Sequence, residues 1–170
     1  MSTYVITGAN RGIGLELCRQ VKVRGHEVVA VCRKPSEDLK QLNVRIVERI
    51  DVSRLKDAER LRQQLNGTKI DILVNVAGVL SKQTLGEIDD EAIENIRHQF
   101  DVNAIGPILV TQALLDLMSE GSKVGIITSR MGSIEDNSSG GSYGYRMSKA
   151  AVNAAGKSLA MDLKPRGISV

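Results

Sequence analysis

The sequence predicts an α/β fold in which a doubly wound parallel sheet carries helices on both faces. Short β-branched runs alternate with longer segments of helical spacing along the 170 residues, and such alternation is typical of a parallel sheet. Several runs are apolar almost throughout, as expected of strands buried on both sides. No repeat, low-complexity tract or proline-rich linker divides the chain, so a single domain over residues 1–170 is expected.

Five runs are the expected strands, and four longer segments are the expected helices. The strands are residues 4–7, 27–32, 44–50, 70–76 and 123–129, and the helices are residues 12–24, 53–66, 89–120 and 145–164. Gly106-Pro107 is expected to kink or divide the third helix. Pro165 and Gly167 stop the last helix, and residues 168–170 read as the start of another strand. The expected strand order is 3-2-1-4-5 with a stub of strand 6.

Composition and charge argue against several kinds of partner. Hydrophobic residues make up 42% and charged residues 25%, as in an ordinary globular protein. The net charge of +3 is small and the chain has one Phe, three Tyr and no Trp, so no nucleic acid partner is expected. The apolar runs are short, and no membrane-spanning segment is expected. Cys18 and Cys32 form neither a disulfide framework nor a metal-ligand spacing, so the chain is expected to be cytoplasmic and without a metal.

A glycine-rich turn follows the first expected strand and opens the first expected helix. Glycines permit a tight turn and let backbone N–H groups approach a diphosphate at a helix N-terminus. A purely structural turn would give the same pattern, but its place in the first β-α unit favours a dinucleotide site. The turn reads Thr7-Gly8-Ala9-Asn10-Arg11-Gly12-Ile13-Gly14, with the spacing G-x-x-x-G-x-G.

Basic residues follow the second expected strand. Arg33 and Lys34 stand directly after Cys32, where an acidic residue would bind the ribose 2′-hydroxyl of NAD. The guanidinium of Arg33 instead matches the oxygens of a 2′-phosphate, and Arg11 of the glycine-rich turn can join it. Two solvated basic residues are the alternative, but beside a nucleotide-binding turn the pattern favours NADP.

Tyr145 and Lys149 lie four residues apart and therefore share one face of the last expected helix. A neighbouring cation favours the phenolate form, which makes a tyrosine a usable proton donor near neutral pH. The same spacing is often only a surface pair. Tyr143 has Met147 four residues on and cannot form such a pair. Ser129 ends the fifth expected strand, where α/β sheets place ligands.

Six short pieces stand in order along the chain: Thr7-Gly8 with Gly12-Ile13-Gly14, Asp51-Val52, Asn75-Val76-Ala77-Gly78, Asn103, Thr128-Ser129-Arg130-Met131-Gly132, and Tyr145 with Lys149. Each piece is weak alone, but together they are specific. With them the chain resembles the short-chain dehydrogenase/reductase family from residue 4 to residue 170. Residues 8–17 and 129–151 are most similar to the branch that contains C-factor and the sniffer-type carbonyl reductases.

The resemblance implies a Rossmann fold that binds NADP. It implies that Asp51 bonds the adenine amino group beside Val52, and that Asn75 and Gly78 contact the adenosine side. Together with the turn and the basic residues, it makes the expected cofactor-binding residues Thr7, Gly8, Asn10, Arg11, Gly12, Ile13, Gly14, Arg33, Asp51, Val52, Asn75, Ala77, Gly78, Tyr145 and Lys149.

The resemblance also implies hydride transfer between NADPH and a small carbonyl or alcohol substrate. Tyr145 would protonate the substrate oxygen, and Ser129 would hydrogen-bond the same oxygen. Lys149 would bind the nicotinamide ribose and favour the phenolate of Tyr145. Asn103 would bend its helix and hold a water that links Lys149 to solvent.

Two departures from the family pattern leave other functions open. Val76 stands where the family usually has a second Asn, and we expect a domain that lacks the family's usual C-terminal substrate-binding segment. The alternatives are an enzyme of weak turnover, a non-enzymatic dinucleotide-binding signalling protein similar to C-factor, and an inactive truncated remnant. The enzyme is favoured because the four catalytic residue types are all present.

Self-association is expected for two reasons. Residues 104–120 and 145–164 match the helices that form the dimer face in many family members, so a homo-oligomer through these helices is expected. The outer edge of the fifth strand would be barely covered by residues 168–170, and an open apolar edge invites pairing with another chain.

Overall fold

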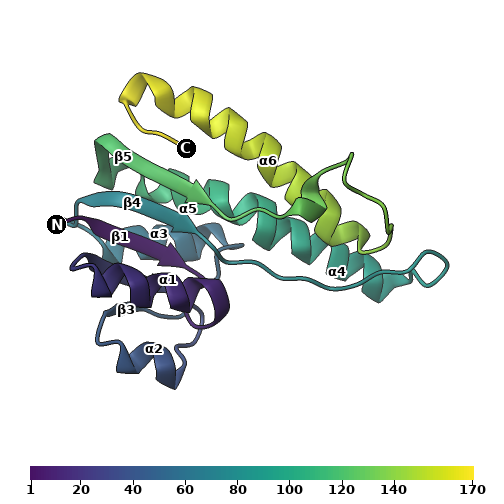
Figure 1. Ribbon diagram of the computed structural model, residues 1–170, viewed down its shortest axis with the longest axis horizontal. Coiled ribbons are helices and arrows are strands. Elements are labelled where there is room, and N and C mark those ends of the chain that lie inside the picture. Colours follow the sequence, from purple (N-terminus) through teal and green to yellow (C-terminus); the bar gives the residue numbers. More distant parts are fainter.

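The computed structural model describes residues 1–170 and contains a five-stranded parallel sheet (Figure 1). Its order is β3-β2-β1-β4-β5, which confirms the predicted fold class and strand order. In the centre, Val5 pairs with Val29 on one side and with Leu73 on the other. The strands are β1 (Thr3–Thr7), β2 (Glu27–Val31), β3 (Arg45–Val47), β4 (Ile70–Asn75) and β5 (Met118–Ile126).

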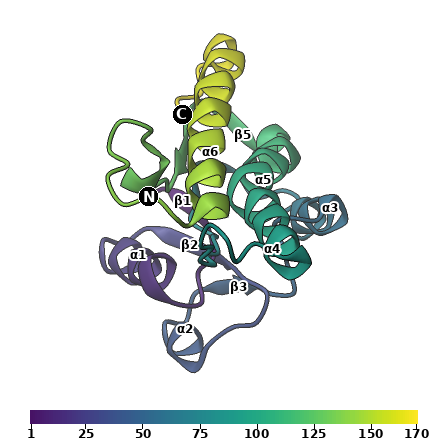
Figure 2. The same cartoon turned by 90° about the vertical axis from the view of Figure 1, so that its right-hand side faces the viewer.

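Helices cover both faces of the sheet, as Figure 2 shows. One face carries α1 (Gly12–Val23) and α2 (Glu37–Gln41). The other carries α3 (Leu55–Gln64) and α5 (Gly106–Leu114), and α4 (Asp90–Phe100) and α6 (Tyr143–Leu163) extend this second layer. The sequence pattern does not predict α2, because five residues are too few to show a helical period. The Ser36 hydroxyl caps it by accepting a hydrogen bond from Leu39 N at 3.2 Å.

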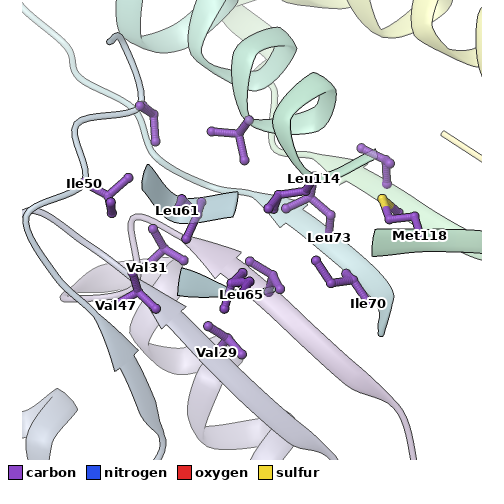
Figure 3. Close-up of a cluster of buried hydrophobic side chains, with 14 of the residues drawn as sticks. Val29, Val31, Val47, Ile50, Leu61, Leu65, Ile70, Leu73, Leu114 and Met118 are labelled. Carbon is purple, nitrogen blue, oxygen red and sulfur yellow. The ribbon is translucent and has the colours of Figure 1, made fainter. Parts of the chain in front are cut away.

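Aliphatic side chains fill the space between the sheet and its second layer (Figure 3). Val29, Val31 and Val47 of neighbouring strands share one cluster with Leu61 of α3 and Leu114 of α5. Burying each such side chain stabilises the fold by about 1.5–3 kcal/mol. The cluster under α1 and α2 consists of Ile6, Ala9, Leu15, Cys18, Val21, Val28, Ala30, Cys32 and Leu39. Packing on both faces holds the carboxyl ends of the strands in place.

One continuous helix from Asp90 to Leu117 contains both α4 and α5. A π-helical turn (Asp101–Ile105) joins them, and a 3-10 turn (Leu115–Leu117) ends the helix. Pro107 has no N–H and cannot bond the carbonyl oxygen of Asn103 four residues back. The expected helix 89–120 is thus interrupted by the π-turn, and α5 begins at Gly106-Pro107, where the sequence predicts a kink or a division.

This 28-residue helix is long and apolar enough to cross a membrane by length and composition, with a mean hydropathy of 1.2 over an 18-residue stretch. The expectation that no segment could do so is wrong, because it counted only uninterrupted apolar runs. Core helices of folded proteins pass the same test, and 44% of this stretch is buried inside the fold. The helix is therefore weak evidence for a membrane.

Several boundaries differ from the expected ones. β3 covers Arg45–Val47 and not residues 44–50, and α3 covers Leu55–Gln64 and not residues 53–66. The chain enters β5 at Met118, so residues 118–120 are strand and not helix, and α6 begins at Tyr143, two residues early. β5 ends at Ile126, and Ser129 caps a 3-10 turn (Arg130–Gly132) beyond it. A second 3-10 turn (Lys164–Arg166) follows α6, and the expected sixth strand is a single bridge between Lys123 and Ser169.

Candidate active site

A cavity of about 730 Å³ opens at the carboxyl ends of the strands, the usual place for a ligand in an open α/β sheet. Predicted residues from distant parts of the chain meet in its wall. They are Gly8, Asn10, Arg11, Gly12, Ile13, Gly14, Arg33, Asp51, Val52, Ala77, Gly78, Ser129, Tyr145 and Lys149.

The glycine-rich turn leaves space along this wall because side chains do not fit there. A Cβ on Gly8, whose φ is +64°, would lie 2.7 Å from the Cα of Ala77, and one on Gly14 would meet the carbonyl oxygen of Gly8. α1 begins without a side-chain cap and without an acidic residue in its first turn. Its first N–H groups and its positive dipole end therefore suit an anion such as a diphosphate. This cradle fits a dinucleotide.

Two predicted cofactor residues lie behind the wall. Thr7 is buried, and its hydroxyl accepts hydrogen bonds from Val76 N at 3.0 Å and Ala77 N at 3.2 Å. It thereby ties the end of β1 to the end of β4. Asn75 is also buried, and its side-chain amide donates to the Thr111 hydroxyl of α5 at 3.3 Å. Contacts of Thr7 and Asn75 with a cofactor stay predictions.

Asn103 lies in the π-turn, also outside the wall, and fixes the segment that follows β4. Its side-chain oxygen accepts a hydrogen bond from Val79 N at 2.8 Å. Its amide nitrogen donates to Val79 O at 2.8 Å and to the Ser148 hydroxyl at 3.0 Å. Ser148 in turn donates to the carbonyl oxygen of Tyr145 at 2.8 Å. Asn103 therefore connects the loop after β4 with α6, and the water between it and Lys149 stays a prediction.

Ser129, Tyr145 and Lys149 all line the cavity. Lys149 is 4% exposed, its Nζ lies 5.8 Å from the centroid of the Tyr145 ring, and it donates to the carbonyl oxygen of Ile127 at 2.8 Å. Burial lowers the pKa of Lys149, because the interior disfavours its charged form. The Ser129 hydroxyl accepts from Met131 N at 3.1 Å and keeps its own proton to donate. These groups can serve a carbonyl oxygen as proton and hydrogen-bond donors.

Asp51 and Arg33 also line the cavity. Burial acts to raise the pKa of Asp51, but other contacts outweigh it and hold the pKa below its usual range. These are hydrogen bonds from the Ser53 hydroxyl at 2.6 Å and Ser53 N at 3.1 Å, and the charges of Arg33 and Arg54. Asp51 is therefore an anion that can accept a hydrogen bond from an amino group. Arg33 and Arg11 are exposed, so their guanidinium groups are accessible to the phosphate of a ligand that enters the cavity.

The structure adds residues that the sequence motifs do not predict. Val79 and Leu80 line the cavity directly after Gly78. Neither carries a reactive group, and the available signal is their position next to a matched piece. Gln83 is 5% exposed and accepts a hydrogen bond from Gly144 N at 2.9 Å. No local pattern indicates this contact, because the two residues are 61 positions apart.

A parallel sheet with a glycine-rich first turn and a tyrosine–lysine pair at its strand ends is the architecture of a dinucleotide-dependent Rossmann oxidoreductase. The family model described as short chain dehydrogenase matches residues 2–170. The chain belongs to this family, an oxidoreductase family that uses NAD(P).

Named relatives agree with the predicted branch. The 1-hydroxy-2-glutathionyl-2-methyl-3-butene dehydrogenase of Rhodococcus sp. (strain AD45) is 40% identical over 172 residues, which cover 100% of this chain and 75% of that protein. The C-signal of Myxococcus xanthus is 44% identical over 101 residues, which cover 58% of this chain and 59% of that protein.

Solved structures support the same assignment. Carbonyl reductase Sniffer of D. melanogaster has a TM-score of 0.87 at 28% identity, over 99% of this chain and 77% of that one. A short-chain dehydrogenase/reductase of Burkholderia multivorans with bound NADP has a TM-score of 0.86 at 29% identity, over 98% of this chain and 75% of that one. The predicted family resemblance is confirmed.

Proposed function

We propose that the chain is an NADP-dependent oxidoreductase that acts between NADPH and a carbonyl or alcohol substrate. The observation that carries this proposal is one cavity whose wall contains both Arg33 and Asp51 and the Tyr145–Lys149 pair. Its volume is that of a cofactor or ligand site. NADPH supplies the hydride when bound, and the chain supplies binding, orientation and a proton.

Tyr145 is the proposed general acid toward the substrate oxygen, and Ser129 donates a hydrogen bond to the same oxygen. A positioned acid of this kind contributes about 10²–10⁴-fold in rate. Lys149 is a buried ammonium 5.8 Å from the tyrosine ring, and its charge favours the phenolate that remains after proton transfer. Asn103 supports this end of the site through Val79 and Ser148.

Arg33 and Arg11 are the proposed partners of the 2′-phosphate that distinguishes NADP from NAD. Both are exposed on the cavity wall, and the charge of Arg33 reaches Asp51, the proposed adenine contact. Hydrogen bonds to a charged group contribute about 1.5–3 kcal/mol, which is about tenfold or more in affinity. The bound NADP of the Burkholderia structure supports this choice.

The test compares binding of NADPH and NADH by titration calorimetry. The wild-type chain should bind NADPH about tenfold or more tightly than NADH, and Arg33→Asp should abolish or reverse the preference. Arg24→Asp is the matched control, because Arg24 is exposed after α1 and does not line the cavity. Equal affinity of the wild-type chain for both cofactors would contradict the NADP assignment.

Turnover is tested with small aldehydes and ketones in the reducing direction. In the oxidising direction, 1-hydroxy-2-glutathionyl-2-methyl-3-butene is the first alcohol to try, because it names the Rhodococcus relative. We further propose that the protein works in the cytoplasm. Both cysteines, Cys18 and Cys32, are free and buried, as suits a reducing compartment.

A signalling protein that binds a dinucleotide without turnover is the second candidate, favoured by the identity with C-signal over 101 residues. Such a function needs the cofactor contacts but not the phenol of Tyr145. NADPH binding together with no reduction of any carbonyl would support it. Absence of both binding and cooperative unfolding would instead indicate an inactive remnant.

A further inference from the structure

Gln83 is a buried polar residue outside the cavity wall, and both the oxygen and the nitrogen of its side-chain amide form hydrogen bonds. It lies between β4 and α4 and is 5% exposed. Its Oε1 accepts a hydrogen bond from Gly144 N at 2.9 Å, and its backbone oxygen accepts one from Ser142 N at 3.0 Å. Its Nε2 donates to the backbone oxygen and the hydroxyl of Ser81, at 3.1 and 2.9 Å.

Helix α6 begins without a cap of its own. The first N–H groups of a helix have no partner inside it and need acceptors from elsewhere. Ser142 stands at the cap position with a left-handed φ of 48°, its side chain makes no capping bond, and the first turn has no acidic residue. Gly140 and Gly141 before it are also left-handed, with φ of 63° and 62°. Gln83 therefore supplies, from another loop, the acceptor that a local cap usually provides.

The capped N–H belongs to the residue directly before Tyr145. Gly144 also lies close to α4: a Cβ there would be 3.0 Å from the Cα of Ile96. Packing on one side and the Gln83 bond on the other thus fix the backbone at the point from which the Tyr145 side chain enters the cavity. The segment that carries Gln83 also contributes Val79 and Leu80 to the cavity wall.

We infer that Gln83 is a positioning residue, which caps α6 across the fold and so holds Tyr145 in place for proton transfer. The inference rests on the proposed function, because it assigns Tyr145 as the acid. A shift of about 1 Å in such a group is enough to cost about a hundredfold in rate.

Two substitutions distinguish loss of the hydrogen-bond acceptor from a change in the shape of the side chain. Gln83→Met has a similar size and no strong acceptor, whereas Gln83→Glu keeps an oxygen facing Gly144 N. Ser122→Ala is the control for loss of a buried polar side chain: Ser122 is 3% exposed, and its hydroxyl accepts from Ser119 N at 3.1 Å and donates to Ile70 O at 2.9 Å, away from the start of α6. Thermal unfolding of all three variants measures the general structural cost.

With NADPH and a turned-over carbonyl, Gln83→Met should lower kcat by about tenfold or more, with an unchanged NADPH affinity. Gln83→Glu should restore kcat, and Ser122→Ala should keep kcat near the wild-type value even where its melting temperature falls. Equal loss of kcat in Gln83→Met and Ser122→Ala, or no rescue by Gln83→Glu, would overturn the positioning role.

Amide hydrogen exchange of Gly144, measured by NMR, is independent of activity. The Gly144 N–H should be protected in the wild type and in Gln83→Glu, and should exchange fast in Gln83→Met. Equal protection in the wild type and Gln83→Met would overturn the cap. A wild-type chain that binds NADPH without turnover would contradict the proposed activity, and the exchange rates would still decide whether Gln83 caps α6.

Discussion

Tyr143 and Tyr145 stand two residues apart in the first turn of α6, and of the two Tyr145 lines the cavity. Tyr145→Phe removes the phenolic proton and keeps the ring, so it should abolish nearly all turnover, about 10²-fold or more, and leave NADPH affinity unchanged. Tyr143→Phe is the control and should matter much less. Steady-state kinetics and calorimetry check both variants, and normal turnover of Tyr145→Phe would show that the tyrosine–lysine spacing is accidental.

The lowered pKa of Asp51 predicts that the free energy of unfolding decreases at acid pH. Its pKa is lower in the folded chain than its usual value, so the unfolded chain binds the proton more tightly. The stabilisation is fully present above the unfolded pKa of about 3.9 and is lost as pH falls through the folded pKa. Asp51→Asn should therefore flatten the loss of stability below about pH 4.

Urea midpoints measured across the acid range check this prediction. Asp162→Asn is the control, because Asp162 is exposed at the end of α6 and forms no ion pair. An acid limb of equal slope in the wild type and Asp51→Asn would contradict the assigned stabilisation.

Two glycines of α6 test how closely this helix packs. A Cβ on Gly144 would be 3.0 Å from the Cα of Ile96 and would meet the Gln99 amide, whereas one on Gly156 would lie 3.6 Å from Ile126 Cδ1. Gly144→Ala should therefore destabilise the protein by about 1–3 kcal/mol. Gly156→Ala should stabilise it by about 1 kcal/mol, because Ala favours a helix over Gly. Urea unfolding measures both, and equal effects would mean that α6 is free to shift.

The order of the elements could be predicted because hydrophobic period and β-branched runs are local signals. α2 could not be predicted, because a helix of five residues with Leu39 as its buried residue is too short to show a helical period. The start of β5 was misplaced because apolar spacing continues from Leu114 through Met118, and the change of direction there depends on pairing of Met118 with Ile70. The start of α6 at Tyr143 could not be predicted, because Gly144 disfavours a helix. This start depends on a hydrogen bond from Gly144 N to Gln83 in a distant loop.

In the candidate site, too, some features could be predicted from the sequence and others could not. Residues with a chemical signature, such as Arg33 and Tyr145, could be predicted and lie on one cavity wall. Thr7 could be predicted as part of the turn, but its bonds to the chain after β4 could not. Contacts of this kind join residues about seventy positions apart, and no local spacing indicates them.

For the whole molecule, the outer edge of β5 is partly paired. Gly121 N donates to Gly167 O at 3.0 Å, and Val124 N donates to Ser169 O at 2.8 Å. The pairing is limited to residues 167–169, in agreement with the expected edge that residues 168–170 barely cover. Self-association, which stays a proposal, is better supported by exposed apolar side chains of the predicted helices. These are Ile105, Ile108, Met147 and Met161, which are 37–55% exposed.

Ile108→Lys should therefore shift the oligomer toward monomer, because it places a charge on this apolar surface. Val23→Lys is the control: Val23 is 81% exposed at the end of α1, on the other side of the sheet. Native mass spectrometry over a dilution series measures the distribution. A wild-type chain that is a clean monomer at micromolar concentration and unfolds cooperatively would contradict the proposed oligomer.

The π-turn at Asp101–Ile105 also sets the rotational phase between α4 and α5. An α-helix turns by about 100° per residue, and a π-turn takes up one residue more than an α-turn. Deleting one residue there, together with Pro107→Ala to restore the missing N–H, would leave both helices facing the core as before. An insertion would instead rotate Val110 and Leu114 out of it. Asn103, whose side chain bonds both backbone groups of Val79, lies within this π-turn, so we expect the extra residue to serve the site and not the packing of the two helices.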